Sequence, residues 1–199
     1  MAKVAGNKER ILVAASQTLL EKGVEGLSVR AISTKAGLST IAIYSHFQGK
    51  QGVLDALYVE GFERVRDAMV SADDHDDPLQ SVLAGSEKYL QFAQHNEGHY
   101  RLIFGETGSS YAPSDEALEA SQNAFNVLVS GVSRLLPADA TQASRQRAAL
   151  RVWAVLHGYV SLRHHVIGPV LDYAQWHRMA MEAVGLTIKE IANTLGKSA

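Results

Sequence analysis

The chain has 199 residues, of which 46% are apolar and 20% are charged, a composition ordinary for a globular protein. It contains no cysteine, which excludes disulfides and thiolate metal sites. No apolar run approaches the roughly 18 residues of a membrane span, and the N-terminus lacks the apolar core of a signal peptide. We therefore expect a cytoplasmic protein with no membrane segment.

The net charge of −2 hides an asymmetry along the chain. Residues 1–50 carry seven lysines and arginines against three glutamates, a net charge of +4, so residues 51–199 carry −6. A basic N-terminal segment on an acidic remainder indicates a polyanionic partner, although a short basic segment is often only a solvated surface.

Three short helical segments are predicted in the first fifty residues. Apolar residues at spacings of three and four cover residues 8–22 and end at a glycine. Ser28 is a good N-cap for a second helix, which Gly37 ends. Ser39 then begins a third helix within GLSTIAIYSHF, residues 37–47, even though this segment is rich in β-branched and aromatic residues.

The remainder is also helical in pattern, and no strand pattern of convincing length occurs. The predicted helices cover residues 51–71, 79–96, 99–106, Ser114 or Asp115 to the LLPADAT segment, Thr141 to about Ile167, and about Asp172 to Leu195. We predict an all-α fold of about nine helices. Residues 1–52 would form a three-helix helix-turn-helix domain, and residues 53–199 a larger helical domain.

The AGLS turn between the second and third segments has the form of a helix-turn-helix, in which the second helix of the pair enters the DNA major groove. Ile43 and Phe47 lie four residues apart and can face inward, against Leu12, Leu19, Val29 and Ile32. The outward residues are then Thr40, Ile41, Tyr44 and Ser45, with Ala42 and His46 at the edges. From spacing alone, a DNA-reading helix and the exposed side of an ordinary small helix remain equally open.

The segment VEGLSVRAISTKAGLSTIAIYSHFQGKQGVLDAL resembles the DNA-binding signature of the tetracycline-repressor (TetR) family of transcription regulators. The matching positions are Ser28, Val29, Ile32, Ala36, Gly37, Leu38, Ser39, Ile43, Tyr44, His46, Phe47 and Lys50. The resemblance covers about residues 8–60 in fixed register, and the rest of the chain matches in helical layout.

The resemblance implies a DNA-binding surface. Tyr44 and Lys50 would contact phosphates, as would Ser28 and Arg30 at the start of the second helix. The residues nearest the bases would be Thr40, Ile41, Ala42, Ser45 and His46, with Ser39 at the start of the same surface. Three positions depart from the family pattern: Ile41, Ala42 and Gly52. We expect Ile41 to read DNA shape or a thymine methyl group.

The C-terminal half resembles a TetR-like subgroup named for a Trp-His-Gly signature. The similar segments are RVWAVLHGYVSL and the aromatic AQHNEGHYRLIFGE. The family resemblance implies a pocket for a small lipophilic or aromatic effector, although core packing is an alternative for each aromatic residue. The predicted lining is Phe62, Tyr89, Tyr100, Phe104, Phe125, Trp153, His157, Val160 and His164.

The last two predicted helices carry a stripe of small residues that permits close helix contact. The resemblance implies that these helices form a four-helix interface in a homodimer, while ordinary monomer core is the alternative. The predicted interface residues are Ala154, Gly158, Ser161, His165, Ala180, Ala183, Val184, Thr187 and Ile191.

A helical metal-dependent enzyme is the alternative function, using His95 and His99 or His157 and His164. HNEGH is not the H-E-x-x-H zinc motif, and no nucleophile elbow or phosphate-binding loop occurs. We therefore expect no catalytic residues, no metal and no cofactor. The expected protein is a ligand-responsive repressor released from a palindromic DNA operator by its effector.

Overall fold

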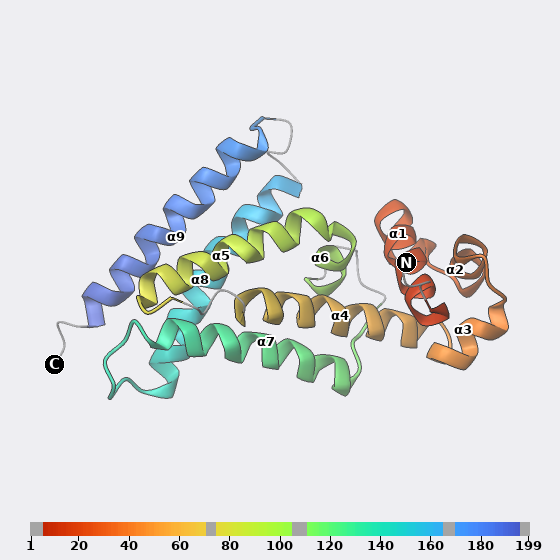
Figure 1. Ribbon diagram of the computed structural model, residues 1–199, viewed down its shortest axis with the longest axis horizontal. Helices are drawn as coiled ribbons and strands as arrows, with labels where there is room; N and C mark the ends of the chain where they lie inside the picture. Colours follow the sequence, from red (N-terminus) through yellow and green to blue (C-terminus); the bar gives the residue numbers. More distant parts are fainter. Residues whose placement is uncertain (1–5, 71–74, 105–110, 165–169, 196–199) are drawn as a thin grey trace. The chain divides into compact units, whose positions relative to one another are not determined.

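The computed structural model describes residues 6–70, 75–104, 111–164 and 170–195. Within these ranges it contains helices and no strand (Figure 1). The helices are α1 (Asn7–Gly26), α2 (Val29–Ala36), α3 (Thr40–Phe47), α4 (Lys50–Val70), α5 (Pro78–His95), α6 (Glu97–Ile103), α7 (Asp115–Ser133), α8 (Gln142–Leu162) and α9 (Tyr173–Leu195). The all-α prediction is confirmed.

The chain divides into two compact units that interleave in sequence. One comprises residues 1–64 and 96–122, and the other comprises residues 65–95 and 123–199. Helices α4 and α7 each contribute residues to both units. The division into a DNA-binding domain of residues 1–52 and an effector-binding and dimerisation domain of residues 53–199 stays a prediction.

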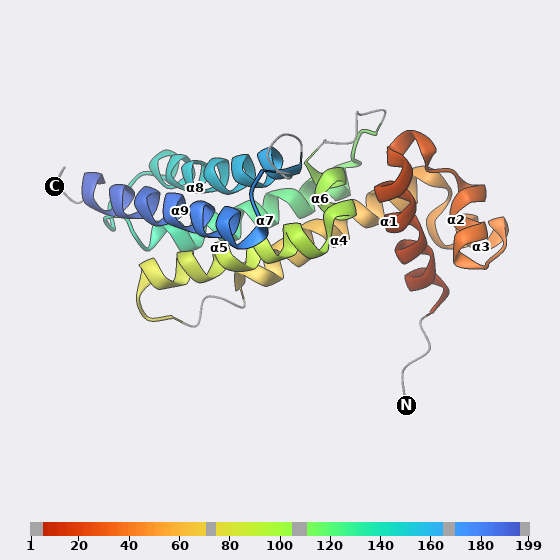
Figure 2. The same cartoon turned by 90° about the horizontal axis from the view of Figure 1, so that it is seen from above.

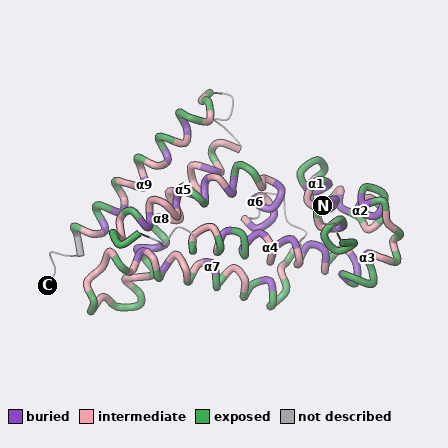
Figure 3. Tube along the Cα trace, viewed as in Figure 1, coloured by how far each residue is buried: buried purple, intermediate pink, exposed green. Residues whose placement is uncertain are grey.

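In the first unit, α1 packs on α2 and α3, and α2 packs on α3. The apolar side chains that fill this contact include Ile11, Leu19, Ile32, Ile43 and Phe47, all buried (Figure 3). Ile11, one residue before the predicted Leu12, is the fully buried position at the start of α1. The regular turns of α1 stop at Gly23, whose φ of 65° and ψ of −175° are not helical.

In the second unit, α5, α8 and α9 pack together, and α5 and α9 run side by side in both views (Figure 2). Their buried residues include Leu90, Val152, Leu156, Val184 and Ile188. Thr141 and Asp172 begin α8 and α9 by accepting hydrogen bonds from the backbone N–H groups of Ser144 and Gln175. Over the described residues, no helix is both long enough and apolar enough to cross a membrane.

The junction of α3 and α4 leaves no room for a side chain at position 52. A Cβ added to Gly52 would overlap the backbone carbonyl oxygen of Phe47. This contact gives a physical reason for glycine at one of the three positions that depart from the TetR pattern, because α4 begins directly against the end of α3.

We predict that Gly52→Ala lowers the free energy of unfolding by about 1–3 kcal/mol, since the backbone must shift to admit the methyl group. Gly85→Ala is the matched control. Gly85 also lies within a helix, but a Cβ there would have no atom within 4 Å, so the control should be neutral or stabilising by up to about 1 kcal/mol. Urea denaturation of both variants tests this, and equal stabilities would contradict it.

Candidate nucleic-acid interface

Helix α3 is fixed at both ends by its own sequence. The Ser39 hydroxyl accepts a hydrogen bond from the Ala42 N–H at 3.3 Å, which caps the N-terminus. Gln48 ends the helix in the left-handed region with a φ of 60°, and its N–H donates to the Tyr44 carbonyl at 2.9 Å. The helix is only 8 residues long, so it depends on the burial of Ile43 and Phe47 for its stability.

The opposite side of α3 carries two large side chains in solvent. Ile41 is 77% exposed and Tyr44 is 57% exposed. Ser45 and His46 are exposed beside them, while Thr40 and Ala42 are half-buried. The predicted base-contacting residues therefore all belong to α3. Ile41 and Tyr44, the two large side chains on its outer side, are mostly exposed to solvent.

The predicted phosphate contacts Ser28, Arg30 and Tyr44 all reach the surface. The Ser28 hydroxyl caps α2 by accepting from the Ala31 N–H at 3.1 Å. A capping hydroxyl still has its O–H to donate, so capping α2 and donating to a phosphate are compatible. The Tyr44 ring lies against Gly49, where an added Cβ would be 3.4 Å from Cε1.

Lys50 has a structural partner that the sequence did not indicate. Its ammonium group donates to the Val24 carbonyl at 2.7 Å and is partly buried. This bond ties the start of α4 to the last turn of α1, beyond the break at Gly23. A lysine ammonium has three donors, so a phosphate contact by Lys50 stays a prediction alongside this role.

Arg10 is a positioning residue that the sequence analysis missed. Its guanidinium donates to the carbonyls of Ala36 at 2.7 Å and Gly37 at 3.3 Å. These carbonyls lie at the C-terminus of α2, where a positive charge is also favoured by the helix dipole. Because 26 residues separate Arg10 from Ala36, no local pattern could have revealed the contact.

The predicted effector residues form aromatic clusters within each unit. In the first unit, the ring centroids of Phe62 and Phe104 are 5.8 Å apart, and those of Tyr100 and Phe104 are 4.6 Å apart. Phe62 also lies 5.0 Å from the Tyr58 ring. Phe62 and Tyr58 belong to α4, Tyr100 belongs to α6, and Phe104 directly follows α6. Phe62 and Tyr100 are buried.

In the second unit, Trp153 connects two other predicted residues. Its ring centroid is 5.7 Å from that of Phe125, and its Nε1–H donates to the Tyr89 hydroxyl at 3.3 Å. The remaining predicted residues lie on α8 and its C-terminal extension: Val160 is buried, and His157 and His164 are half-buried.

A groove of about 760 Å³ lies between α5 and α9 of the second unit, and none of the predicted effector residues lines it. Its lining includes Leu79, Tyr173, His177 and Met181. No local pattern in the sequence predicts this groove, because it arises where two helices nearly a hundred residues apart pack together.

The predicted dimer residues fall into two groups. Ala180, Val184 and Ile191 are fully buried in the chain's own core, so they have almost no surface left to bury against a second subunit. Ala154 is exposed, and Gly158, Ser161, Ala183 and Thr187 are partly exposed. His165 lies outside the described residues. The large exposed apolar residues of α8 and α9 are Leu150, Leu162, Met179 and Leu186.

His95 and His99 do not share a helix, because α5 ends at His95 and α6 begins at Glu97. The zinc spacing considered for them therefore does not apply. Both nitrogens of His99 contact protein groups, Ser16 and Glu60. Among the described residues, no group of three or more histidine, aspartate or glutamate side chains could hold a metal ion.

Helix α2 ends at the glycine turn, and α3 follows it, capped at Ser39 and with an exposed outer side. This arrangement defines the helix-turn-helix class of protein. Two family models match this chain. Residues 11–57 match "Bacterial regulatory proteins, tetR family", and residues 82–179 match "Tetracyclin repressor-like, C-terminal domain". The second range contains both segments that resemble the Trp-His-Gly subgroup. The chain belongs to the TetR family of bacterial regulatory proteins.

Known relatives are similar over different shares of the chain. The tetracycline repressor protein class D of Escherichia coli is 32% identical over 95 residues, which are 48% of this chain and 38% of that protein. The transcriptional regulator BetI of Stenotrophomonas maltophilia is 29% identical over 191 residues, covering 93% of this chain and 94% of that protein. The chain spans about two fifths to half the length of the first curated relatives that it matches.

The same fold occurs in solved structures. A protein of unknown function from Rhodococcus sp. RHA1 superposes with a TM-score of 0.75 at 24% identity, covering 98% of each chain. This likeness supports the fold assignment for the chain as a whole.

Proposed function

We propose that this protein is a homodimeric DNA-binding repressor that releases a palindromic operator when a small lipophilic or aromatic effector binds. DNA binding in this proposal involves Ser28, Arg30, Ser39, Thr40, Ile41, Ala42, Tyr44, Ser45, His46 and Lys50. Operator binding would place the protein in the cytoplasm. The relatives named above are regulators and none is named as an enzyme. Within the described part of the chain, no group of side chains supports the metal-dependent alternative.

The observation that carries the proposal is the exposure of Ile41 and Tyr44 on the outward side of α3. Large apolar side chains in water are unfavourable, but bases and thymine methyl groups can cover them in the major groove. The net charge of +4 on residues 1–50 supports the same surface, because it attracts phosphates.

The proposed mechanism uses the spacing of two recognition helices. A homodimer would present two α3 helices to major grooves about one helical turn, or a multiple of a turn, apart. An effector that binds one dimer conformation more tightly than the other shifts the population toward that conformation. The difference between the effector's binding free energies for the two conformations limits how far DNA affinity can change. The clusters around Phe62 and Trp153 are the proposed source of contacts with an aromatic effector.

We predict that Arg30→Gln and Tyr44→Phe weaken operator binding in distinguishable ways. Each arginine that neutralises a phosphate releases counterions. A homodimer loses two such arginines in Arg30→Gln, so the slope of log Kd against log salt should fall by about 1.8. Tyr44→Phe removes a neutral donor and should weaken binding several-fold with the slope unchanged. Fluorescence anisotropy on a duplex from the region upstream of the gene, at four salt concentrations, measures both.

The control for these two variants is Gln17→Ala, an exposed residue of α1 outside the predicted DNA surface. Unchanged affinity in both Arg30→Gln and Tyr44→Phe would contradict the assigned phosphate contacts.

We also predict that Ile41 recognises a thymine methyl group. Replacing the contacted thymine by uracil removes only that methyl and should weaken wild-type binding about 4-fold, the effect of burying one methyl group. Ile41→Ala should bind the thymine and uracil duplexes equally. A scan of single uracil substitutions across the operator identifies the position. Equal discrimination by wild type and Ile41→Ala at every position would contradict the assignment.

A further inference from the structure

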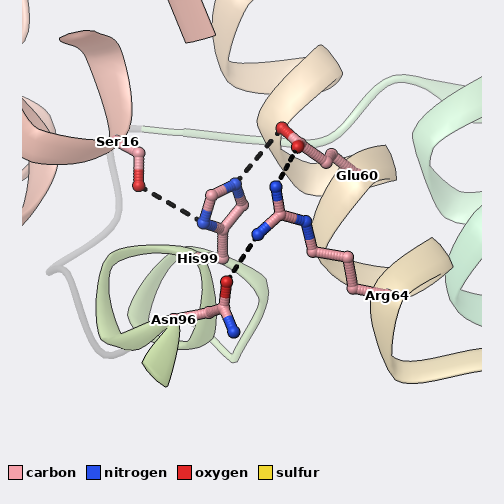
Figure 4. A network of polar contacts seen from close by, with 5 residues as sticks. All are labelled: Ser16, Glu60, Arg64, Asn96 and His99. Atoms are coloured by element: carbon pink, nitrogen blue, oxygen red, sulfur yellow. Dashed lines mark hydrogen bonds and ion pairs between the residues drawn. The ribbon is translucent and has the colours of Figure 1, made fainter. Parts of the chain in front are cut away.

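His99 joins three helices of the first unit through both of its ring nitrogens (Figure 4). Nδ1 lies 3.2 Å from the Ser16 hydroxyl of α1, and Nε2 lies 3.3 Å from a carboxylate oxygen of Glu60 in α4. His99 itself belongs to α6 and is only 7% exposed. A buried polar side chain with two such partners is costly to leave unsatisfied.

The chemistry of the partners sets the direction of these hydrogen bonds. The hydrogen bond from His99, together with the nearby Arg64 charge, lowers the pKa of the Glu60 carboxyl although burial opposes this. Glu60 is therefore an ionised acceptor at neutral pH, so Nε2 carries a proton and donates. Nδ1 pairs with the Ser16 hydroxyl, which has both an O–H to donate and lone pairs to accept.

Two close contacts at glycines lie beside His99. A Cβ added at Gly98 would lie 2.9 Å from the Ser16 carbonyl oxygen, so α6 contacts α1 with no side chain between them. A Cβ added at Gly61 would lie 2.8 Å from Ile103 Cγ2, so the Ile103 side chain of α6 packs directly on the backbone of α4.

Arg64 extends the network to the start of α6. Its guanidinium donates to Glu60 and to the Asn96 side chain, and Asn96 is the residue before α6 begins (Figure 4). The carboxylate of Glu60 is therefore held by two donors from two helices. This fixes the acceptor to which His99 donates.

Helix α1 also contacts both helices of the helix-turn-helix, α2 and α3. Arg10 caps the end of α2, and Lys35 of α2 forms an ion pair with Glu21 of α1 at 2.6 Å. Lys8 lies 5.9 Å from the centre of the Phe47 ring of α3. A displacement of α1 therefore carries α2 and α3 with it.

We infer that His99 is a positioning residue for DNA binding, which sets the place of α1 on α6 through Ser16 and the place of α6 on α4 through Glu60. This inference rests on the proposed DNA-binding function. It predicts that operator affinity depends on the hydrogen bond between Ser16 and His99, which is remote from the DNA surface. The Ser16 hydroxyl should therefore have no effect on affinity once His99 is replaced.

A double-mutant cycle tests the inference. Ser16→Ala removes the hydroxyl alone, from a half-buried site that tolerates the change. His99→Gln removes the ring nitrogen that faces Ser16. We expect each variant to weaken binding of the upstream duplex by about five-fold or more, with the slope against salt unchanged because the phosphate contacts are intact. The double variant should bind no more weakly than His99→Gln alone.

The outcomes separate this inference from the function on which it rests. Affinity is measured well below the unfolding temperature of each variant, with Gln17→Ala as the control in α1. Wild-type affinity in Ser16→Ala and His99→Gln, or a double variant weakened by the product of the single effects, would overturn the positioning role. A wild-type protein that binds no upstream duplex would instead overturn the proposed function.

Discussion

The burial of Ile43 and Phe47 is the interaction on which the recognition surface depends. Helix α3 is too short to be stable by itself, so it exists because these two side chains pack against α1 and α2. Their spacing of four residues also fixes the rotation of the helix. Ile41 and Tyr44 must then point away from the core, and the surface proposed to bind DNA follows from which residues are buried.

Glycines and long basic side chains add to the apolar core of this unit. Gly52 and Gly98 allow backbones to approach where a methyl group would collide. Arg10 and Lys50 donate to main-chain carbonyls at the ends of α2 and α1. Part of the positive charge of residues 1–50 thus has a structural use, and the remaining exposed charge, such as Arg30, is available to phosphates.

The sequence predicted those features that local chemistry determines. The caps at Ser28, Ser39 and Thr141 and the stop at Gly37 are all observed, because each involves residues within one turn of each other. The contacts of Arg10, Lys50 and His99 were missed, because their partners lie 26 to 83 residues away in the chain. The sequence left open whether Ala180, Val184 and Ile191 belong to a monomer core or a dimer interface, because a stripe of apolar residues fits both. All three are buried within one chain.

The central claim is that the outward side of α3 is the surface that binds DNA. The most direct test is a crystal structure of the protein bound to a duplex from the region upstream of its gene. The account predicts α3 in the major groove, with Ile41 within about 4 Å of a base edge and the Tyr44 hydroxyl within hydrogen-bond distance of a phosphate. A complex in which DNA contacts another surface and leaves Ile41 and Tyr44 in solvent would contradict it.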